Sequence, residues 1–229
     1  MPYPRRSRFC SIVFDLDGTL IDSVGDISLG INRVLAEEGL PTLSVKTVRT
    51  LVGDGATTLV RDAFVTAGRP LGEPDGVKAM TRRYLDHYAE QDVDPGCLYP
   101  GVVETLAMLD GEGFSLALCT NKAERITLPL LEELGLARHF DAVVGGDTLA
   151  SRKPSPEPLL FALQRIGGRP DAAVMVGDNR NDVAAARGAG MPVVAVSYGY
   201  PRMAVEALGA DRVIDRFADL PAALDKLAG

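Results

Sequence analysis

The amino-acid sequence predicts an α/β fold, in which a parallel sheet is covered by helices on both faces. The first observation is that six short apolar runs, rich in β-branched residues, recur along the chain between Gly, Pro or Asp residues. The second is that amphipathic helical patterns separate most of these runs. The third is that residues 22–95 carry helical patterns without a convincing strand. We therefore expect a Rossmann-like parallel sheet core with an all-helical block inserted after the first strand.

Six segments are expected to form the strands: "SIVF" (11–14), "SLALC" (115–119), "DAVVG" (141–145), "AAVMVG" (172–177), "PVVAV" (192–196) and "DRVID" (211–215). Their nearly continuous apolar character is typical of parallel strands that are buried on both faces. Between them, "GVVETLAMLDGEG" (101–113) has apolar residues at 102, 106 and 109. "EPLLFALQRIGG" (157–168) has them at 159, 160, 163 and 166. This spacing predicts helices that each pack one face on the sheet.

The inserted block repeats the helical spacing three times, in "DSVGDISLGINRVLAEEGL" (22–40), "ATTLVRDAFVTAG" (56–68) and "GVKAMTRRYLDHYAE" (76–90). We therefore expect a core of residues 1–21 and 96–229 and a helical domain of residues 22–95. Its two connections to the core are expected to act as hinges, at residues 20–24 and 93–100.

Composition excludes several classes of protein. The content of 46% hydrophobic and 24% charged residues is typical of a soluble globular protein, and the net charge of -7 argues against a nucleic-acid partner. Three widely spaced cysteines, Cys10, Cys97 and Cys119, indicate a reducing compartment rather than a disulfide framework. No apolar run reaches the length of a signal or of a membrane span, so a cytoplasmic protein without a membrane partner is expected.

Polar side chains follow four of the predicted strands at the points where the strands end. Because ligands of parallel sheets bind outside the carboxyl ends of the strands, these residues are expected to meet. They are Asp15, Asp17, Gly18 and Thr19 after the first strand, Thr120 and Asn121 after the second, Lys153 after the third, and Asp178 and Asp182 after the fourth. Lys122 and Asn179 are interpreted as solvated loop residues.

So many carboxylates cannot lie together ionised without a cation, since like charges raise each other's pKa. Oxygen ligands without His or Cys favour Mg²⁺, which shares its coordination with substrate phosphate. A hydroxyl, backbone amides and a lysine would hold the remaining phosphate oxygens. His87 and His139 fall outside these motifs, so histidine-based hydrolysis is not expected.

This constellation resembles the haloacid dehalogenase-like hydrolase superfamily over nearly the whole chain: "DLDGTL" resembles its first motif, Thr120 its second, Lys153 its third and "GDNRND" its fourth. The helical insert resembles the small cap domain of that superfamily. The resemblance implies that Asp15 is the nucleophile, which forms an aspartyl-phosphate, and that Asp17 is the general acid and base.

The same resemblance implies that Mg²⁺ is bound by Asp15, the main-chain carbonyl of Asp17 and Asp178. Asp182 would orient waters or Lys153 from outside the metal's own ligands. Thr120, Asn121 and Lys153 would stabilise the transferred phosphoryl group, while Gly18 permits the tight turn that brings backbone N–H groups to it.

The presence of Asp17 favours a phosphatase or phosphomutase over a dehalogenase, because an ester oxygen must be protonated as it leaves. "LVGDGATTLV" and the C-terminal half resemble the phosphoglycolate phosphatase family. Backbone N–H groups at Gly53, Gly55 and Ala56, with Arg61 or Arg33, could receive a substrate carboxylate. Asp54 would repel it unless turned away or hydrogen-bonded.

The expected function is therefore Mg²⁺-dependent hydrolysis of a small phosphomonoester, with 2-phosphoglycolate as the favoured substrate. The enzyme alternatives are a sugar-phosphate phosphatase, a phosphosugar mutase or a pyrophosphatase on the same scaffold. The non-enzyme alternative is a signalling module that is phosphorylated on Asp15. A small phosphorylated metabolite is the expected partner, and the protein is expected to be a monomer or a homodimer.

Overall fold

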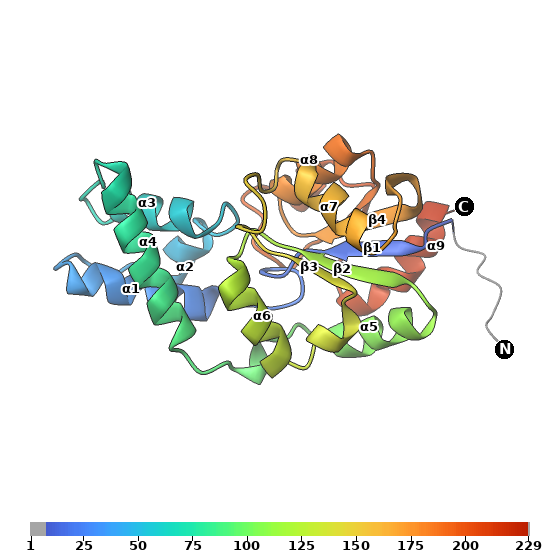
Figure 1. Cartoon of the computed structure of the whole chain (residues 1–229), viewed down its shortest axis with the longest axis horizontal. Coiled ribbons are helices and arrows are strands. Elements are labelled where there is room, and N and C mark those ends of the chain that lie inside the picture. Colours follow the sequence, from blue (N-terminus) through green and yellow to red (C-terminus); the bar gives the residue numbers. More distant parts are fainter. Residues whose placement is uncertain (1–7, 229) are drawn as a thin grey trace.

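The computed structural model describes residues 8–228 and contains one six-stranded sheet (Figure 1). All neighbouring strands are parallel, in the order β3-β2-β1-β4-β5-β6. The strands are β1 (Ser11–Phe14), β2 (Ser115–Cys119), β3 (Ala142–Val144), β4 (Ala173–Gly177), β5 (Val193–Val196) and β6 (Arg212–Ile214). All six predicted strands are confirmed, each within two residues of its expected bounds, and with them the α/β class.

The strands are apolar on both faces because each face is covered by a separate hydrophobic cluster. In β1, Ile12 and Phe14 belong to one cluster, whereas Val13 belongs to the other. Alternate side chains along a strand therefore pack into two different hydrophobic clusters. This arrangement explains why the strands read as continuous apolar runs.

The core helices are α5 (Val102–Gly111), α6 (Glu124–Glu133), α7 (Glu157–Arg165), α8 (Arg180–Ala189) and α9 (Leu220–Ala228). Helices α5, α6 and α9 contribute to the cluster of Phe14, and α7 and α8 to the cluster of Val13. The apolar spacing within residues 101–113 and 157–168 predicted α5 and α7. Helix α6 was not predicted, since Pro129 interrupts the helical pattern.

The helical insert comprises α1 (Val24–Glu37), α2 (Val45–Arg49), α3 (Ala56–Thr66) and α4 (Pro74–Ala89), and residues 22–95 contain no named strand. These helices pack around a third cluster that includes Ile31, Phe64 and Tyr84. In Figure 1 they stand to one side of the sheet, beyond its edge near α6. The short helix α2 was not predicted, since five residues are too few to show a helical period.

The chain enters and leaves the insert through two segments that lie side by side. Ile21 and Leu98 form an antiparallel bridge, the Asp22 N–H donates to the Cys97 carbonyl at 2.7 Å, and the Tyr99 N–H donates to the Leu20 carbonyl at 3.0 Å. The insert is thus joined to the sheet by one narrow pair of crossings. Among residues 8–228, the helices are too short or too polar for any to span a membrane.

Candidate active site

The candidate site lies at the carboxyl edge of the sheet, where three adjacent strands end. Asp15 follows β1, Thr120 follows β2 and Asp178 follows β4, and these strands are neighbours in the order β2-β1-β4. Because all three strands run in the same direction, their ends bring together residues that are more than 160 positions apart in the sequence.

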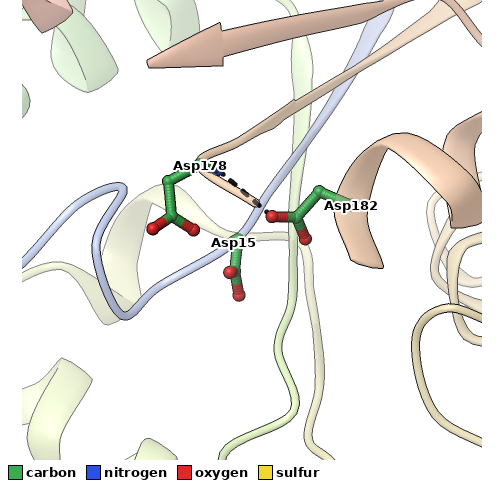
Figure 2. A group of neighbouring side chains, drawn as sticks. All are labelled: Asp15, Asp178 and Asp182. Atoms are coloured by element: carbon green, nitrogen blue, oxygen red, sulfur yellow. Dashed lines mark hydrogen bonds between the residues drawn. The ribbon is translucent and has the colours of Figure 1, made fainter. Parts of the chain in front are cut away.

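Three buried carboxylates form the centre of the site. Asp15, Asp178 and Asp182 each offer an oxygen, and these oxygens all lie within 4.8 Å of one another (Figure 2). Lys153 Nζ lies 2.9 Å from Asp15 Oδ1 and 2.6 Å from Asp182 Oδ1. The lysine is itself buried, so it is a fixed positive charge between two of the three acids.

Asp182 is held by the start of helix α8. It occupies the third helical position of a capping box whose N-cap is Asn179, and its Oδ2 accepts the N–H groups of Asp178 at 3.1 Å and Asn179 at 3.2 Å. With Oδ1 occupied by Lys153, both oxygens have donors. Asp182 is therefore arranged to position Lys153 and the Asp178 loop.

The cluster has an excess of negative charge. Burial, and then the neighbouring Asp182 carboxylate, raise the pKa of Asp15 to about 7 against the opposing effect of Lys153. Burial, and then the neighbouring carboxylates of Asp182 and Asp15, raise the pKa of Asp178 well above its ordinary range. One lysine does not balance three carboxylates, so this donor set fits an added cation.

The loops around Asp178 are closely packed, with glycine where they approach it. A Cβ atom at Gly18 would collide with the Asp178 carboxylate, and so would one at Gly199. Gly18 also has a φ of 83°, a conformation that favours glycine. Asp178 Oδ2 accepts the Tyr200 N–H at 2.6 Å, which ties the loop after β5 to the site. This cradle of oxygen donors suits Mg²⁺.

Asp17 has different neighbours from Asp15. Its Oδ1 accepts the Ser23 hydroxyl at 2.5 Å and lies 3.1 Å from Lys122 Nζ. Lys122 also donates to the Tyr88 hydroxyl at 3.0 Å, and its side chain is only 7% exposed. Burial acts to lower the pKa of Lys122, but Asp17 and then the hydroxyls of Tyr88 and Tyr84 raise it above its ordinary value.

The interpretation of Lys122 as a solvated loop residue is therefore wrong. The ion pair with Asp17 offsets the cost of burying the ammonium. Its position directly after Thr120 and Asn121, at a strand end, was the available signal. Asn179 is likewise engaged: its side chain donates to Asp178 Oδ1 at 2.8 Å and caps helix α8.

Thr120 and Asn121 hold the loop after β2. The Thr120 hydroxyl accepts the Lys122 N–H at 3.2 Å, and Asn121 Nδ2 donates to the Lys153 carbonyl at 2.9 Å. The same Asn121 amide donates to the Gly53 carbonyl of the insert, also at 2.9 Å. Its side chain thus connects the core to the insert, in addition to any contact with a ligand.

A pocket lies between the sheet edge and the insert. It is lined by Asp15, Asp17, Ile27, Val52, Gly53, Gly55, Ala56, Leu59, Tyr84, Leu85, Tyr88, Thr120, Asn121, Lys122, Ala123 and Ile126. Three of the residues predicted to read the substrate, Gly53, Gly55 and Ala56, line it. Arg61 does not: its side chain is 54% exposed and pairs with Asp62 at 3.3 Å.

Asp54 is turned away from the pocket that holds Asp15. Its carboxylate accepts from Asn181 Nδ2 at 2.7 Å and from Arg202 Nη1 at 2.8 Å. The concern that Asp54 would repel a substrate carboxylate is met by these two donors. Asn181 and Arg202 were not identified from the sequence. Arg202 lies in the loop that follows β5, and this loop begins at the same carboxyl edge of the sheet.

Residues 12–196 match the family described as haloacid dehalogenase-like hydrolase. A phosphoglycolate phosphatase of Rhodospirillum rubrum is 45% identical over 215 residues, which cover 92% of this chain and 88% of that protein. A "predicted phosphoglycolate phosphatase" from Haemophilus somnus has a TM-score of 0.87 and 35% identity, over 96% of this chain and 99% of that one. CbbY from Rhodobacter sphaeroides, solved in complex with phosphate, has a TM-score of 0.80 and 28% identity, covering 95% and 99%.

The chain belongs to the haloacid dehalogenase-like hydrolases and is a phosphoric monoester hydrolase. The fold and the acids that follow β1 and β4 agree with these matches. Within that family it groups with relatives that carry the name phosphoglycolate phosphatase at 40% to 45% identity. The resemblance stated from the sequence motifs is confirmed.

Proposed function

We propose that this phosphatase hydrolyses 2-phosphoglycolate to glycolate and phosphate. The observation that carries the proposal is a pocket that opens on both Asp15 and Asp17 and is closed on its other side by the insert. A nucleophile and a proton donor facing one small space suit a compact phosphomonoester. The names of its relatives support 2-phosphoglycolate as that ester.

In the first step, an oxygen of Asp15 attacks phosphorus and forms an aspartyl-phosphate as the ester P–O bond breaks. The leaving alkoxide takes a proton from Asp17. In the second step, Asp17 takes a proton from water, which attacks phosphorus and releases phosphate and the Asp15 carboxylate. Lys153 holds Asp15 in place at 2.9 Å and, with Thr120, faces the transferred group.

The residues that would hold Mg²⁺ in this proposal are Asp15, the main-chain carbonyl of Asp17 and Asp178, with Asp182 supporting Lys153. When bound, the ion supplies positive charge beside the phosphoryl oxygens. Three buried carboxylates face one buried lysine in this cluster, and their excess negative charge supports a bound cation. Gly18 and Gly199 lie so close to Asp178 that a Cβ atom at either position would collide with its side chain.

The helical insert is proposed to act as a cap that opens for substrate and closes over it. Asp15 of the core and Ala56 and Leu59 of the insert line the same pocket, so movement of the insert would change the access of a substrate to Asp15. The paired crossings at Ile21 and Leu98 are the narrow connection about which such a movement would occur. The division into residues 1–21 with 96–229 and residues 22–95, and a cytoplasmic location, stay predictions.

The test is Mg²⁺-dependent phosphate release from a panel of 2-phosphoglycolate, sugar phosphates, a sugar bisphosphate, nucleotides and pyrophosphate. We expect 2-phosphoglycolate to have the highest kcat/KM, and EDTA to abolish turnover. If another phosphate ester is preferred, the substrate assignment is wrong while the phosphatase class stands. Pyrophosphate or a sugar phosphate as the best substrate would favour the corresponding alternative.

A further inference from the structure

The charged side chains of the pocket are confined to one part of its lining. Its walls toward the insert are apolar, formed by side chains such as Ile27, Leu59 and Tyr84, and its floor holds the acids Asp15 and Asp17. Among the pocket-lining residues in the described chain, Lys122 alone carries a cationic side chain. A substrate with a second anion beyond its phosphate would find its counter-charge there.

Lys122 is fixed in position before any ligand arrives. Its N–H donates to the Thr120 hydroxyl at 3.2 Å, and its carbonyl accepts the Gly146 N–H at 2.8 Å. Its ammonium lies 4.2 Å from the centre of the Tyr88 ring and donates to the hydroxyl of the same residue. The charge is therefore presented at one place, at little further cost in side-chain entropy.

The ammonium retains donor capacity for a ligand. It carries three N–H bonds, and within residues 8–228 it contacts the Tyr88 hydroxyl at 3.0 Å and the Asp17 oxygens at 3.1 Å (Oδ1) and 3.5 Å (Oδ2). The contact at 3.5 Å is the longest of the three, and a ligand carboxylate can replace it. Tyr88 accepts from Lys122, which leaves its own O–H proton to be donated. The two side chains together can supply at least two hydrogen bonds to a carboxylate.

The distance of Lys122 from the reacting atoms also suits a short substrate. Asp17 is the group that exchanges a proton with the ester oxygen, and Lys122 Nζ lies 3.1 Å from its carboxylate. In 2-phosphoglycolate the carboxylate carbon is only two bonds from that ester oxygen. A group in contact with Asp17 is thus within reach of this carboxylate, whereas the far end of a sugar phosphate would extend past it.

We propose that Lys122 determines specificity by binding the carboxylate of the substrate, with the Tyr88 hydroxyl as a second donor. This inference rests on the proposed function. The core residue Lys122 and the insert residue Tyr88, which are already in contact at 3.0 Å, would then both bind the carboxylate, so that bound substrate adds to the contacts between the insert and the sheet edge.

The test compares 2-phosphoglycolate with glycolamide phosphate, which has the same shape but a neutral amide in place of the carboxylate. In Lys122→Met we expect kcat/KM for 2-phosphoglycolate to fall by about 10- to 100-fold, mainly through KM, as for loss of a charge-assisted hydrogen bond. Because Lys122 also contacts Asp17, the value for glycolamide phosphate should fall as well, but by a smaller factor than the value for 2-phosphoglycolate. The ratio of the two values therefore collapses toward one.

Matched variants separate recognition from a structural role. Lys122→Arg, which keeps the charge, should retain most of the ratio, and Lys78→Met, at a cap lysine that is 82% exposed, should leave it unchanged. Tyr88→Phe, which removes only a hydroxyl, should lower the ratio of the two kcat/KM values several-fold. If Lys122→Met does not fold, this second variant tests the inference. An equal loss for both substrates, or an unchanged ratio in Tyr88→Phe, would overturn the inference. A wild-type enzyme that does not prefer 2-phosphoglycolate to its amide would instead overturn the proposed function.

Discussion

At the scale of single residues, one intervening position separates two carboxylates with different surroundings. Asp15 lies in the buried cluster, with Lys153 on one oxygen and its pKa raised to about 7 by burial and Asp182. Asp17 lies toward the insert, where Ser23 and Lys122 contact it. Two acids in unlike environments can carry two unlike roles, as nucleophile and as proton carrier.

Asp15→Asn is expected to lower kcat by about 10⁴-fold or more, because the amide cannot form the covalent intermediate. The fold should survive, since the substitution removes one of three crowded carboxylates and keeps the side-chain shape. Phosphate release and thermal unfolding in the absence of Mg²⁺ provide the two measurements. A variant that turns over at a comparable rate would exclude Asp15 as the nucleophile.

At the scale of elements, the loop between α2 and α3 is held by three core segments. Asn121 and Asn181 donate to the Gly53 carbonyl, while Arg202 donates to the Val52 carbonyl and to the Asp54 carboxylate. These bonds come from the loop after β2, the first turn of α8 and the loop after β5. They form a latch (Asn121, Asn181 and Arg202 on residues 52–54), which would stabilise the closed arrangement in the proposed movement of the insert.

Arg202→Ala is expected to favour the open arrangement. We expect KM to rise by about 3- to 10-fold, while stability changes by less than about 1 kcal/mol because the Arg202–Asp54 pair is partly exposed. Spin labels on Lys78→Cys and Arg169→Cys, in a Cys10→Ser background that removes the exposed thiol, report the distance from insert to core. Double electron–electron resonance should show longer distances in the variant.

The control for this experiment is Arg187→Ala, which removes an ion pair with Asp211 that lies entirely within the core. It should leave both KM and the distance distribution as in the wild-type protein. If Arg202→Ala gives an unchanged distribution, or if a substrate analogue never alters the distances, the cap and its hinges at residues 20–24 and 93–100 are wrongly assigned.

At the scale of the whole molecule, the protein is two hydrophobic units with the site between them. The sheet has a cluster on each face, and the insert packs around a third cluster, at Phe64, which also includes Ala123, Ile126 and Tyr200 of the core. The acids lie where these units meet, so the folded state buries charge that the unfolded chain would leave in water. Stability should therefore depend on pH and on bound cations.

The direction in which stability changes with pH follows from the raised pKa values of Asp15 and Asp178. Between the ordinary value of 3.8 and about 7, the folded protein binds a proton that the unfolded chain has released, so stability falls as pH rises through this window. Without Mg²⁺, Tm should fall by at least about 3 °C from pH 5 to 7.5, as for roughly 1 kcal/mol in a chain of this size.

Mg²⁺ should raise Tm more at pH 7.5 than at pH 5, because the ion competes with protons for the carboxylates. Thermal scans at the two pH values, with and without the ion, measure this difference. Asp15→Asn is the matched control and should show a shallower pH dependence. A wild-type Tm that rises across the window without Mg²⁺ would contradict the charge balance described for the cluster.

Much of this architecture could be predicted locally. The six strands could be predicted from apolar runs such as Ile12 to Phe14, because a strand buried on both faces is apolar at nearly every position. Asp15, Thr120 and Asp178 could be expected to meet, because the ends of parallel strands share one edge. The helices of the insert follow from apolar spacing, whereas the five residues of α2 gave no period.

By itself, then, the sequence determined the α/β class, the place of the helical insert and the acids behind β1 and β4, since each depends on local pattern. Only the tertiary structure decided the sheet order and the contacts across the site. It buried Lys122 between Asp17 and Tyr88 and left Arg61 in solvent. A side chain's surroundings are set by which distant segments fold against it, and no local pattern around Lys122 records that Tyr88 will lie above it.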